Sequence, residues 1–320
     1  MPASVSVVIS NYNDKHHLRE CLQSLRGQTL ADFEVIVVDA QSNDGSVEMV
    51  RHEFPECILI NAGNIGPIRA NNLGLYTATG EYVVLDLNSD DVVSSSWLAN
   101  LLGVMERDNS IGIAGGKRYV YGSNRIDSVG GSIDFFTAST PALGVRRRAP
   151  SDLIVDVDYV PVMMMRKRII KEIGVLDEVY EFYFEEPDIC LRAKRAGYRI
   201  VSVTTAVHWH YGSASIGMFS RRKYYYMRRN QIRFAMKNFP LRYLPVCLLW
   251  LIVARTLLDL LSTMPLIRAF AMMASPHSFW ANSTVKLVLA QFGAIRWNLV
   301  HARETFSERA VTSLREKKPL

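Results

Sequence analysis

The stretch GEYVVLDLNSDDVV, residues 80–93, joins an apolar strand to a group of acids. It contains an apolar run, Tyr82–Leu85, and then places three acids and one amide within six positions: Asp86, Asp90, Asp91 and Asn88. Carboxylates this close repel one another and raise each other's pKa unless a cation lies between them. Asn-Ser-Asp-Asp is also favourable turn chemistry. The stretch alone therefore predicts either a turn or a site for a divalent cation held by oxygen ligands.

The sequence before and around this stretch alternates short apolar runs with amphipathic segments. We expect strands at residues 5–10, 33–39, 58–61 and 82–87, and helices at residues 15–28, after the turn at 43–46, and at 67–79. Strands separated by single helices predict an α/β fold with a mostly parallel, doubly wound sheet. Ligands of such sheets bind beyond the carboxyl ends of the strands. Asn11, Asp39 and the acids of residues 86–91 all fall at such ends.

The second half of the chain is less regular. Residues 111–158 are rich in Gly, Ser and basic residues, and we expect loops and short strands there. The segment FEEPDICLRAKRAGY, residues 184–198, predicts a helix with Pro187 in its first turn and Gly197 just past its end. A strand at 199–204 is expected to lead into AVHWHYGSAS, and helical patterns run from residue 218 onward.

Charge is distributed unevenly along the chain. The formal net charge is +6, but the segment between Asp188 and Asp259 contains thirteen Lys and Arg and no acid, which leaves a net −7 for the rest of the chain. A basic block of this kind predicts an anionic partner, either a membrane or a polyphosphate, although solvated helix faces give the same pattern.

Cysteine usage and the first residues predict the compartment. The four cysteines are far apart and form no CxxC pair, which argues against a disulfide framework or a zinc site and fits a reducing compartment. The first residues, MPASVSVVISNYND, have no basic region followed by an apolar run, so no signal peptide is expected. These features predict a cytoplasmic location.

Six segments, taken in order and spacing, resemble the motifs of the inverting glycosyltransferases of family 2, and most closely bacterial rhamnosyltransferase-type members. They are VVISNYND, EVIVVDAQSNDGS, NIGPIRANNLGL, GEYVVLDLNSDD, FYFEEPDICLRAKRAGY and HYGSAS. The resemblance implies a catalytic domain of the GT-A nucleotide-diphospho-sugar transferase fold, a doubly wound mixed sheet, over residues 1–217. Residues 218–320 would then form a basic and apolar helical extension that associates with a membrane.

The resemblance also implies which residues bind the sugar donor. Asn11 and Asp39 would hold the nucleotide base and ribose. The segment NIGPIRANNLGL would let the backbone approach the donor, and Asn88 and Asp90 of NSDD would occupy the two positions of the family's DxD-type motif. The residues that this segment contributes are Asn64, Gly66 and Asn72.

A Mg²⁺ or Mn²⁺ ion is the cofactor that the resemblance implies. Asp90 would be its main ligand, with Asp91 and His210 beside it, and His208 is the competing histidine. The base that activates the acceptor would be Glu186, with Asp188 positioning the acceptor or the base. Because Glu is one methylene longer than the family's commoner Asp, Glu185 or Asp188 could instead be the base.

These roles predict the transfer of one sugar from a nucleotide-diphosphate-sugar, either dTDP-rhamnose or a UDP-sugar, to a hydroxyl of a glycan or lipid-linked acceptor in cell-surface polysaccharide synthesis. The cation would offset the charge that grows on the departing diphosphate. The base would act on a hydroxyl in line with that leaving group, so a single displacement would invert the anomeric carbon.

Three other functions are weighed against this one. A processive polysaccharide synthase of the same fold would carry QxxRW, whereas QFGAIRW at 291–297 has four residues between Gln and Arg. A nucleic-acid-binding protein is suggested by FSRRKYYYMRRNQIRF at 219–234, but the acids of the N-terminal half would repel a phosphate backbone, so no nucleic-acid partner is expected. A NAD-dependent Rossmann enzyme lacks support because no GxGxxG follows the first strand.

The apolar block LPVCLLWLIVARTLLDLL, residues 244–261, suggests contact with a membrane. Its length approaches that of a span, but Arg255 and Asp259 would then lie at depth. An amphipathic helix in the interface fits better, with Trp250 and the leucines in the acyl boundary and the preceding basic segment at the headgroups. We therefore expect peripheral attachment to the inner face of the cell membrane, while a core helix packed on the catalytic domain is the alternative.

Overall fold

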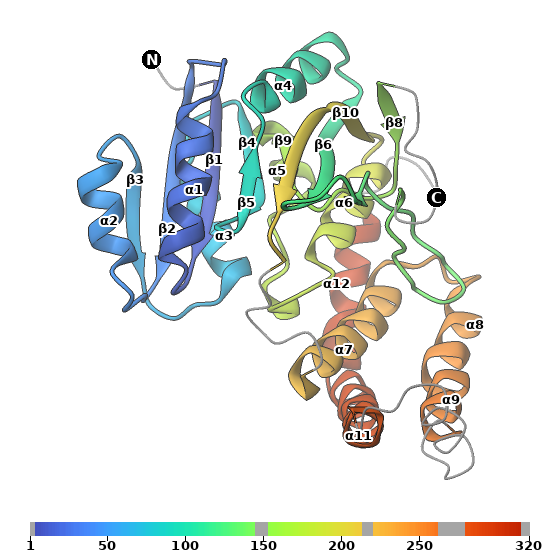
Figure 1. Cartoon of the computed structure of the whole chain (residues 1–320). Helices are drawn as coiled ribbons and strands as arrows, with labels where there is room; N and C mark the ends of the chain where they lie inside the picture. Colours follow the sequence, from blue (N-terminus) through green and yellow to red (C-terminus); the bar gives the residue numbers. More distant parts are fainter. Residues whose placement is uncertain (1–3, 145–152, 213–219, 262–278, 315–320) are drawn as a thin grey trace.

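The computed structural model describes residues 4–144, 153–212, 220–261 and 279–314, and Figure 1 shows a single mixed sheet with helices on its faces. The described strands are β1 (Val5–Asn11), β2 (Phe33–Ala40), β3 (Ile58–Ala62), β4 (Tyr82–Asn88), β5 (Asp91–Val93), β6 (Ile111–Val120), β7 (Ile126–Ser128), β8 (Ile154–Asp156), β9 (Met163–Arg166) and β10 (Arg199–His210). The order is β3-β2-β1-β4-β9-β6-β10-β5, with β7 beside β6 and β8 beside β10.

The helices form two groups. Those that alternate with strands are α1 (Lys15–Arg26), α2 (Ser46–Glu53), α3 (Pro67–Thr77), α4 (Trp97–Arg107), α5 (Lys167–Ile173), the short η1 (Glu178–Tyr180) and α6 (Glu185–Arg195). The second group is α7 (Arg221–Asn238), α8 (Leu244–Leu249), the π-helical η2 (Trp250–Ala254), α9 (Arg255–Leu261), α11 (Phe279–Val300) and α12 (Ala302–Leu314). Figure 1 shows this second group below the half of the sheet that contains β6 and β10.

The expected elements of the first half are confirmed. β1 to β4 and helices α1 and α3 start where the pattern predicts and differ from it by one or two residues at their ends. β1, β2 and β3 are parallel, as is β4 with β1, whereas β9 runs antiparallel between β4 and β6. The sheet is therefore mixed, and β4, β6 and β10 still point the same way.

Two strands extend beyond the sequence-based expectation. β6 is a continuous strand where loops and short strands were predicted. The glycines of β6 make the strand difficult to recognise in the sequence, because Gly is depleted in strands. In the structure, glycine allows close packing here: a Cβ at Gly116 would lie 2.2 Å from the carbonyl oxygen of Ala206. β10 continues to His210, so the HWH segment lies within the strand and not after it.

Strand β4 carries a bulge opposite β1. Val7 pairs with Val84 and Ile9 pairs with Leu87, so one residue of β1 opposes two residues of β4. The extra residue is Asp86, whose φ of 59° lies in the left-handed region that Asp tolerates better than most residues. The bulge changes which face of the sheet each later side chain of β4 meets.

The carboxy-terminal helices pack on the rest of the protein through α7, which contacts α6, α8, α11 and α12. The predicted boundary between residues 217 and 218 lies outside the described residues, as do the basic triplet at 146–148 and the last residues of HYGSAS. One continuous helical segment, Leu244–Leu261, is long and apolar enough to cross a membrane, and 28% of it is buried against the rest of the protein.

Candidate active site

The ends of β1 and β2 bring the two predicted nucleotide-binding residues together. Strand register pairs Asn11 with Asp39, and Asn11 Nδ2 donates a 2.8 Å hydrogen bond to Asp39 Oδ2. The other oxygen of Asp39 accepts from the backbone N–H of Ser42 at 2.8 Å. Asn11 Oδ1 is buried and has no hydrogen-bond partner in the described ranges of the chain. The pair is thus fixed by the sheet and keeps one acceptor atom for a ligand.

The predicted metal ligands also meet. Asp90 and Asp91 follow β4, and antiparallel pairing of β5 with β10 places His210 opposite Asp91. His210 Nδ1 lies 3.1 Å from Asp91 Oδ1 and 3.6 Å from Asp90 Oδ1. Ligand atoms of all three side chains lie within 4.8 Å of one another. Two carboxylates and one imidazole are an N/O donor set that suits Mn²⁺ or Mg²⁺ and leaves positions for phosphate oxygens.

The two histidines of HWH differ in environment. His208 is fully buried against Trp97, with ring centroids 5.9 Å apart, and neither ring nitrogen has a hydrogen-bond partner. Burial lowers the pKa of His208 to about 4, so its ring is neutral. For His210, burial acts to lower the pKa, but the hydrogen bond and charge of Asp91 outweigh it and the pKa is raised. Of the two histidines, His210 is the one whose ring nitrogen lies close to Asp90 and Asp91.

The predicted base lies in the first turn of α6. This helix begins at Glu185, directly after Phe184, whose φ of 75° turns the chain sharply. Burial raises the pKa of Glu186, although a backbone hydrogen bond and the positive charge of Arg118 oppose the shift. Burial and the charges of Glu186 and Asp86 raise the pKa of Glu185 well above its usual range. Among the described residues, Glu185 Oε2 is buried without a hydrogen-bond partner. The first turn of α6 thus presents two acids with raised pKa values, and Glu185 keeps one unsatisfied oxygen.

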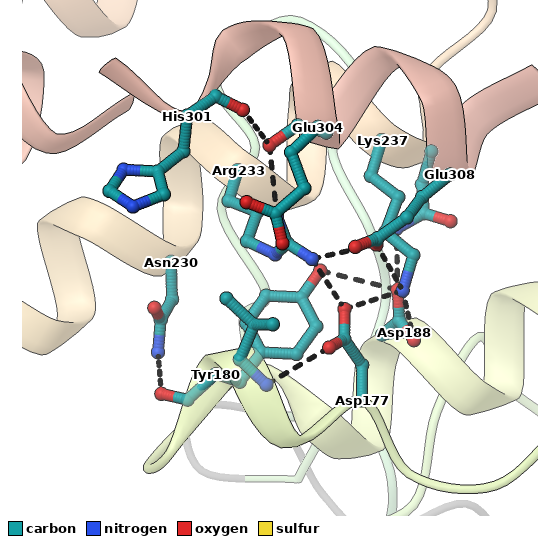
Figure 2. A network of polar contacts seen from close by, with 12 residues as sticks. Asp177, Tyr180, Asp188, Asn230, Arg233, Lys237, His301, Glu304 and Glu308 are labelled. Atoms are coloured by element: carbon teal, nitrogen blue, oxygen red, sulfur yellow. Dashed lines mark hydrogen bonds and ion pairs between the residues drawn. The ribbon is translucent and has the colours of Figure 1, made fainter. Parts of the chain in front are cut away.

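Asp188 has a different environment from the one that the sequence suggested. It is 0% exposed, and Figure 2 shows it inside a network that joins α6 to α7 and α12. Its oxygens accept hydrogen bonds from Arg192 at 2.8 Å, Asn238 at 2.7 Å and Lys237 at 3.3 Å. Burial alone would raise the pKa of Asp188, but the cations Arg192 and Lys237 hold it well below its usual range. Asp188 is therefore an anchor between helices, with no surface left for an acceptor.

The residues of NIGPIRANNLGL divide into two sets. Asn72 is 1% exposed and exchanges hydrogen bonds with the backbone of Leu176, so it fastens α3 to the segment before η1. This contact leaves it no route to a donor. Asn64 and Gly66 instead line a cavity of about 260 Å³. The other residues that line this cavity are Ile65, Ile68, Arg69, Glu178, Glu181, Phe182 and Arg222.

Two further residues belong to the site by position. Arg118 of β6 pairs with Asp127 at 2.6 Å, and its charge also lowers the pKa of Asp91 and acts on Glu186. Asn88, whose backbone N–H donates to Asp91 Oδ2 at 3.0 Å, holds the turn that presents the two aspartates. Arg118 lies in the region that the sequence pattern assigned to loops, and no local signal marked it. Its proximity to the acids follows only from the pairing of β6 with β10.

The fold that these elements define is that of nucleotide-sugar transferases. The structure resembles GalNAc-T7 with UDP, GalNAc and Mn²⁺ (TM-score 0.59, 16% identity, 74% of this chain and 48% of the other). It also resembles the mannosyltransferase PcManGT of Pyrobaculum calidifontis, in complex with GDP-Man and Mn²⁺ (TM-score 0.55, 16% identity, 93% and 88%). At these identities the likeness establishes the GT-A type of fold alone.

The family is shown by sequence. Residues 6–174 match the model of glycosyl transferase family 2, which is more than half of the chain, and the protein belongs to that family. Similar proteins include the uncharacterized glycosyltransferase YibD of Escherichia coli K12 (32% identity, 33% of this chain and 31% of the other). Glycosyltransferase GlyG of Streptococcus pneumoniae serotype 4 is 32% identical over 38% of this chain and 41% of its own. The matched regions thus span about a third of these relatives.

Proposed function

We propose that this protein is a metal-dependent, inverting glycosyltransferase that moves one sugar from a nucleotide-diphosphate-sugar to a hydroxyl of a glycan or lipid-linked acceptor. The observation that supports it most is the Asp90–Asp91–His210 group at the carboxyl edge of the sheet. The family, whose members transfer sugars, supports the same conclusion.

Each group has a role in this reaction. Asn11 and Asp39 bind the base and ribose of the donor, since the sheet fixes this pair at the ends of β1 and β2 and leaves Asn11 Oδ1 available to a ligand. Asp90, Asp91 and His210 would hold a divalent cation, which would offset charge on the departing diphosphate. Glu186 accepts the proton of the attacking hydroxyl, and its raised pKa brings its basicity closer to neutral pH.

A donor panel tests the proposal. dTDP-rhamnose, UDP-sugars and GDP-mannose are each incubated with Mg²⁺, with Mn²⁺ or with EDTA, and release of the nucleoside diphosphate is measured. We expect release from one donor class and none in EDTA. Asp90→Ala should lower the rate at least about 100-fold, the usual size for losing leaving-group stabilisation. Glu48→Ala, an exposed acid on α2, is the matched control and should leave the rate unchanged. Full activity in EDTA would contradict the metal role.

The acceptor and the location are inferred from the carboxy-terminal helices. Exposed apolar side chains recur on one face of α8, η2 and α9, and we call this face the apolar surface. Its residues are Val246, Leu249, Val253, Leu257 and Leu261. The charged residues of the same segment lie elsewhere: Asp259 is 5% exposed and pairs with Arg255 at 3.4 Å and with Arg228 of α7 at 3.7 Å.

The apolar surface supports attachment to the cytoplasmic face of a membrane, near a lipid-linked acceptor in cell-surface polysaccharide synthesis. Such a row of exposed leucines and valines is suited to the headgroup–acyl boundary. The basic segment contributes less than its composition suggests, because Arg229, Arg233 and Lys237 are buried and paired with acids of the catalytic domain. The same burial takes Tyr226 and Arg229 out of the surface of the segment that suggested a nucleic-acid-binding protein.

Vesicle flotation tests the membrane attachment. The wild-type protein should float with vesicles that contain phosphatidylglycerol, and Leu249→Glu/Leu257→Glu should stay in the soluble fraction with its enzymatic activity on soluble substrates intact. Tyr76→Glu removes an equally exposed apolar residue from α3 and should float like the wild type. Flotation of the double variant would show that another surface binds the membrane.

A further inference from the structure

The β4 bulge determines where Asp86 points. Along β4, Val83 and Leu85 pack in the core with α3 and α6, whereas Val84 packs in the core on the opposite face of the sheet. Regular alternation would place Asp86 on the Val84 face. The extra residue shifts Leu87 onto that face instead. Asp86 is left on the side of α3 and α6, where its backbone N–H donates to Asn71 Oδ1 of α3 at 3.1 Å.

Asp86 is buried and incompletely satisfied there. It is 7% exposed, and its Oδ2 atom has no hydrogen-bond partner among the residues that the structure describes. The titratable groups that face it are all on α6: Glu186 acts on Asp86, and Asp86 acts on Glu185 and Cys190. In the described part of the chain, no cation pairs with Asp86, and the cation that reaches Glu186 is Arg118. A buried carboxyl without a partner costs stability unless a bound group satisfies it.

We propose that Asp86 is an acceptor-binding residue, whose free carboxyl oxygen hydrogen-bonds to a hydroxyl of the acceptor beside the hydroxyl that Glu186 deprotonates. The proposal rests on the assignment of Glu186 as base. It also defines the acceptor class: two neighbouring acids need two hydrogen-bond donors, so the acceptor presents two nearby hydroxyls, as a sugar or another polyol does. An acceptor with a single hydroxyl would leave Asp86 unsatisfied, which is costly in a buried site.

The first test measures stability, which needs no substrate. Asp86→Asn keeps the size of the side chain and tolerates the positive φ. Burial and the charge of Glu186 raise the pKa of Asp86 well above its usual range, so the folded state holds that proton more tightly than the unfolded state does. Stability is therefore lost as pH rises from the unfolded pKa through the raised folded pKa. The Asn variant avoids this loss.

We expect Asp86→Asn to melt at least about 3 °C above the wild type at pH 8, and the gain to disappear near pH 4. Glu81→Gln, which neutralises an exposed acid just before the same strand, should melt like the wild type at both pH values. An Asn variant that is less stable than the wild type, or equal to it at pH 8, would show that Asp86 supports the fold and would overturn the proposal.

The second test measures transfer. With the donor selected by the panel, methyl hexosides serve as polyol probes and propan-1-ol as the single-hydroxyl control. The wild type should form product with a methyl hexoside and at least tenfold less with propan-1-ol. Asp86→Ala should lose at least tenfold of the hexoside transfer and keep hydrolysis of the donor by water within about threefold, because water needs no second contact.

The outcomes separate the two proposals. If neither the wild type nor any variant releases nucleoside diphosphate from any donor, the proposed function fails. If release is normal but Asp86→Ala transfers to hexosides as well as the wild type does, or if the wild type prefers propan-1-ol, only the role of Asp86 fails. If folded Asp86→Ala loses both hydrolysis and transfer, the role of Asp86 in acceptor binding is also overturned, because the change then affects binding or reaction of the donor.

Discussion

Glu186 and Asp188 lie two residues apart on α6 and have opposite electrostatic environments. Residues at i and i+2 point to different sides of a helix. Glu186 acts on Asp86 of β4, and burial raises the pKa of Glu186. Asp188 points toward α7 and accepts hydrogen bonds from Lys237 and Asn238 of that helix and from Arg192, one turn later on α6; the two cations lower its pKa.

This difference distinguishes a candidate catalytic residue, Glu186, from a residue that holds helices together, Asp188. In the network of Figure 2, Asp177 and Glu308 pair with Arg233 at 3.0 Å and 2.7 Å, and Asp177 pairs with Lys237 at 2.7 Å. Asp177, Asp188 and Glu308 each pair with a cation there, so the network joins α6, α7 and α12. Within the described part of the chain, Asp86, Glu185 and Glu186 form no ion pair, as expected of groups that must bind or exchange a proton with a substrate.

The largest expected effect on catalysis comes from neutralising Glu186. Glu186→Gln keeps the shape of the side chain but accepts no proton, so kcat should fall roughly a thousandfold while donor binding is retained. Nucleoside diphosphate release and donor titration measure the two quantities. Glu185→Gln is the neighbouring control and should retain most of the activity. If Glu185→Gln is the inactive variant instead, the base is Glu185.

Neutralising Asp188, which pairs with cations, should affect stability. Asp188→Asn leaves Arg192 buried without its counter-charge, whereas Lys237 keeps Asp177, and we expect a loss of about 3 kcal/mol in the free energy of unfolding. Urea denaturation measures it. Adding Arg192→Gln to the first change should recover part of the loss, because it removes the charge that Asp188→Asn leaves unpaired. Additive losses in the double variant would show that Asp188 and Arg192 are not coupled.

Low pH should destabilise the protein through Asp188. Because the folded pKa of Asp188 is lowered, its contribution to stability is present above the unfolded pKa of about 3.9 and is lost as pH falls toward the folded value. The urea midpoint of the wild type should therefore drop between pH 5 and pH 3 more than that of Asp188→Asn. Parallel curves for the two proteins would contradict the lowered pKa.

The smallest effect is expected at the edge of the network. Glu308 of α12 is partly exposed, and Arg233 keeps Asp177 when Glu308 is changed. Glu308→Gln should cost about 1 kcal/mol or less, as is usual for a partly solvated pair. A loss as large as that of Asp188→Asn would mean that α12 is required to hold α7 on the catalytic sheet.

Much of the site could be predicted from local patterns. Apolar runs that end in Asn11, Asp39 and Asp90 already placed these side chains at strand ends, and parallel strands bring such ends to one edge. The pairing of Asn11 with Asp39 and the grouping of Asp90, Asp91 and His210 agree with that expectation. The roles of these residues in binding donor and metal remain predictions.

Other features could not be predicted in this way. Asn72 carries a motif position yet bonds to the backbone of Leu176, more than one hundred residues later in the chain. The acid-free basic segment looked like a surface for an anionic partner, whereas Arg229 and Arg233 turn inward to Glu181 and Asp177. Composition records how many cations a helix has, but not which side of it meets the acids of a distant element.

The sequence by itself determined the alternation of strands and helices, the family and the strand ends where the polar groups lie, because these depend on short-range periodicity and turn chemistry. Only the tertiary structure decided which buried acids are paired and which are not. A single extra residue in β4 turns Asp86 toward α6, and the docking of α7 adds Lys237 and Asn238 to the Arg192 that lies one turn along α6 from Asp188. Strand register and helix docking join residues far apart in the chain, so no local pattern contains them.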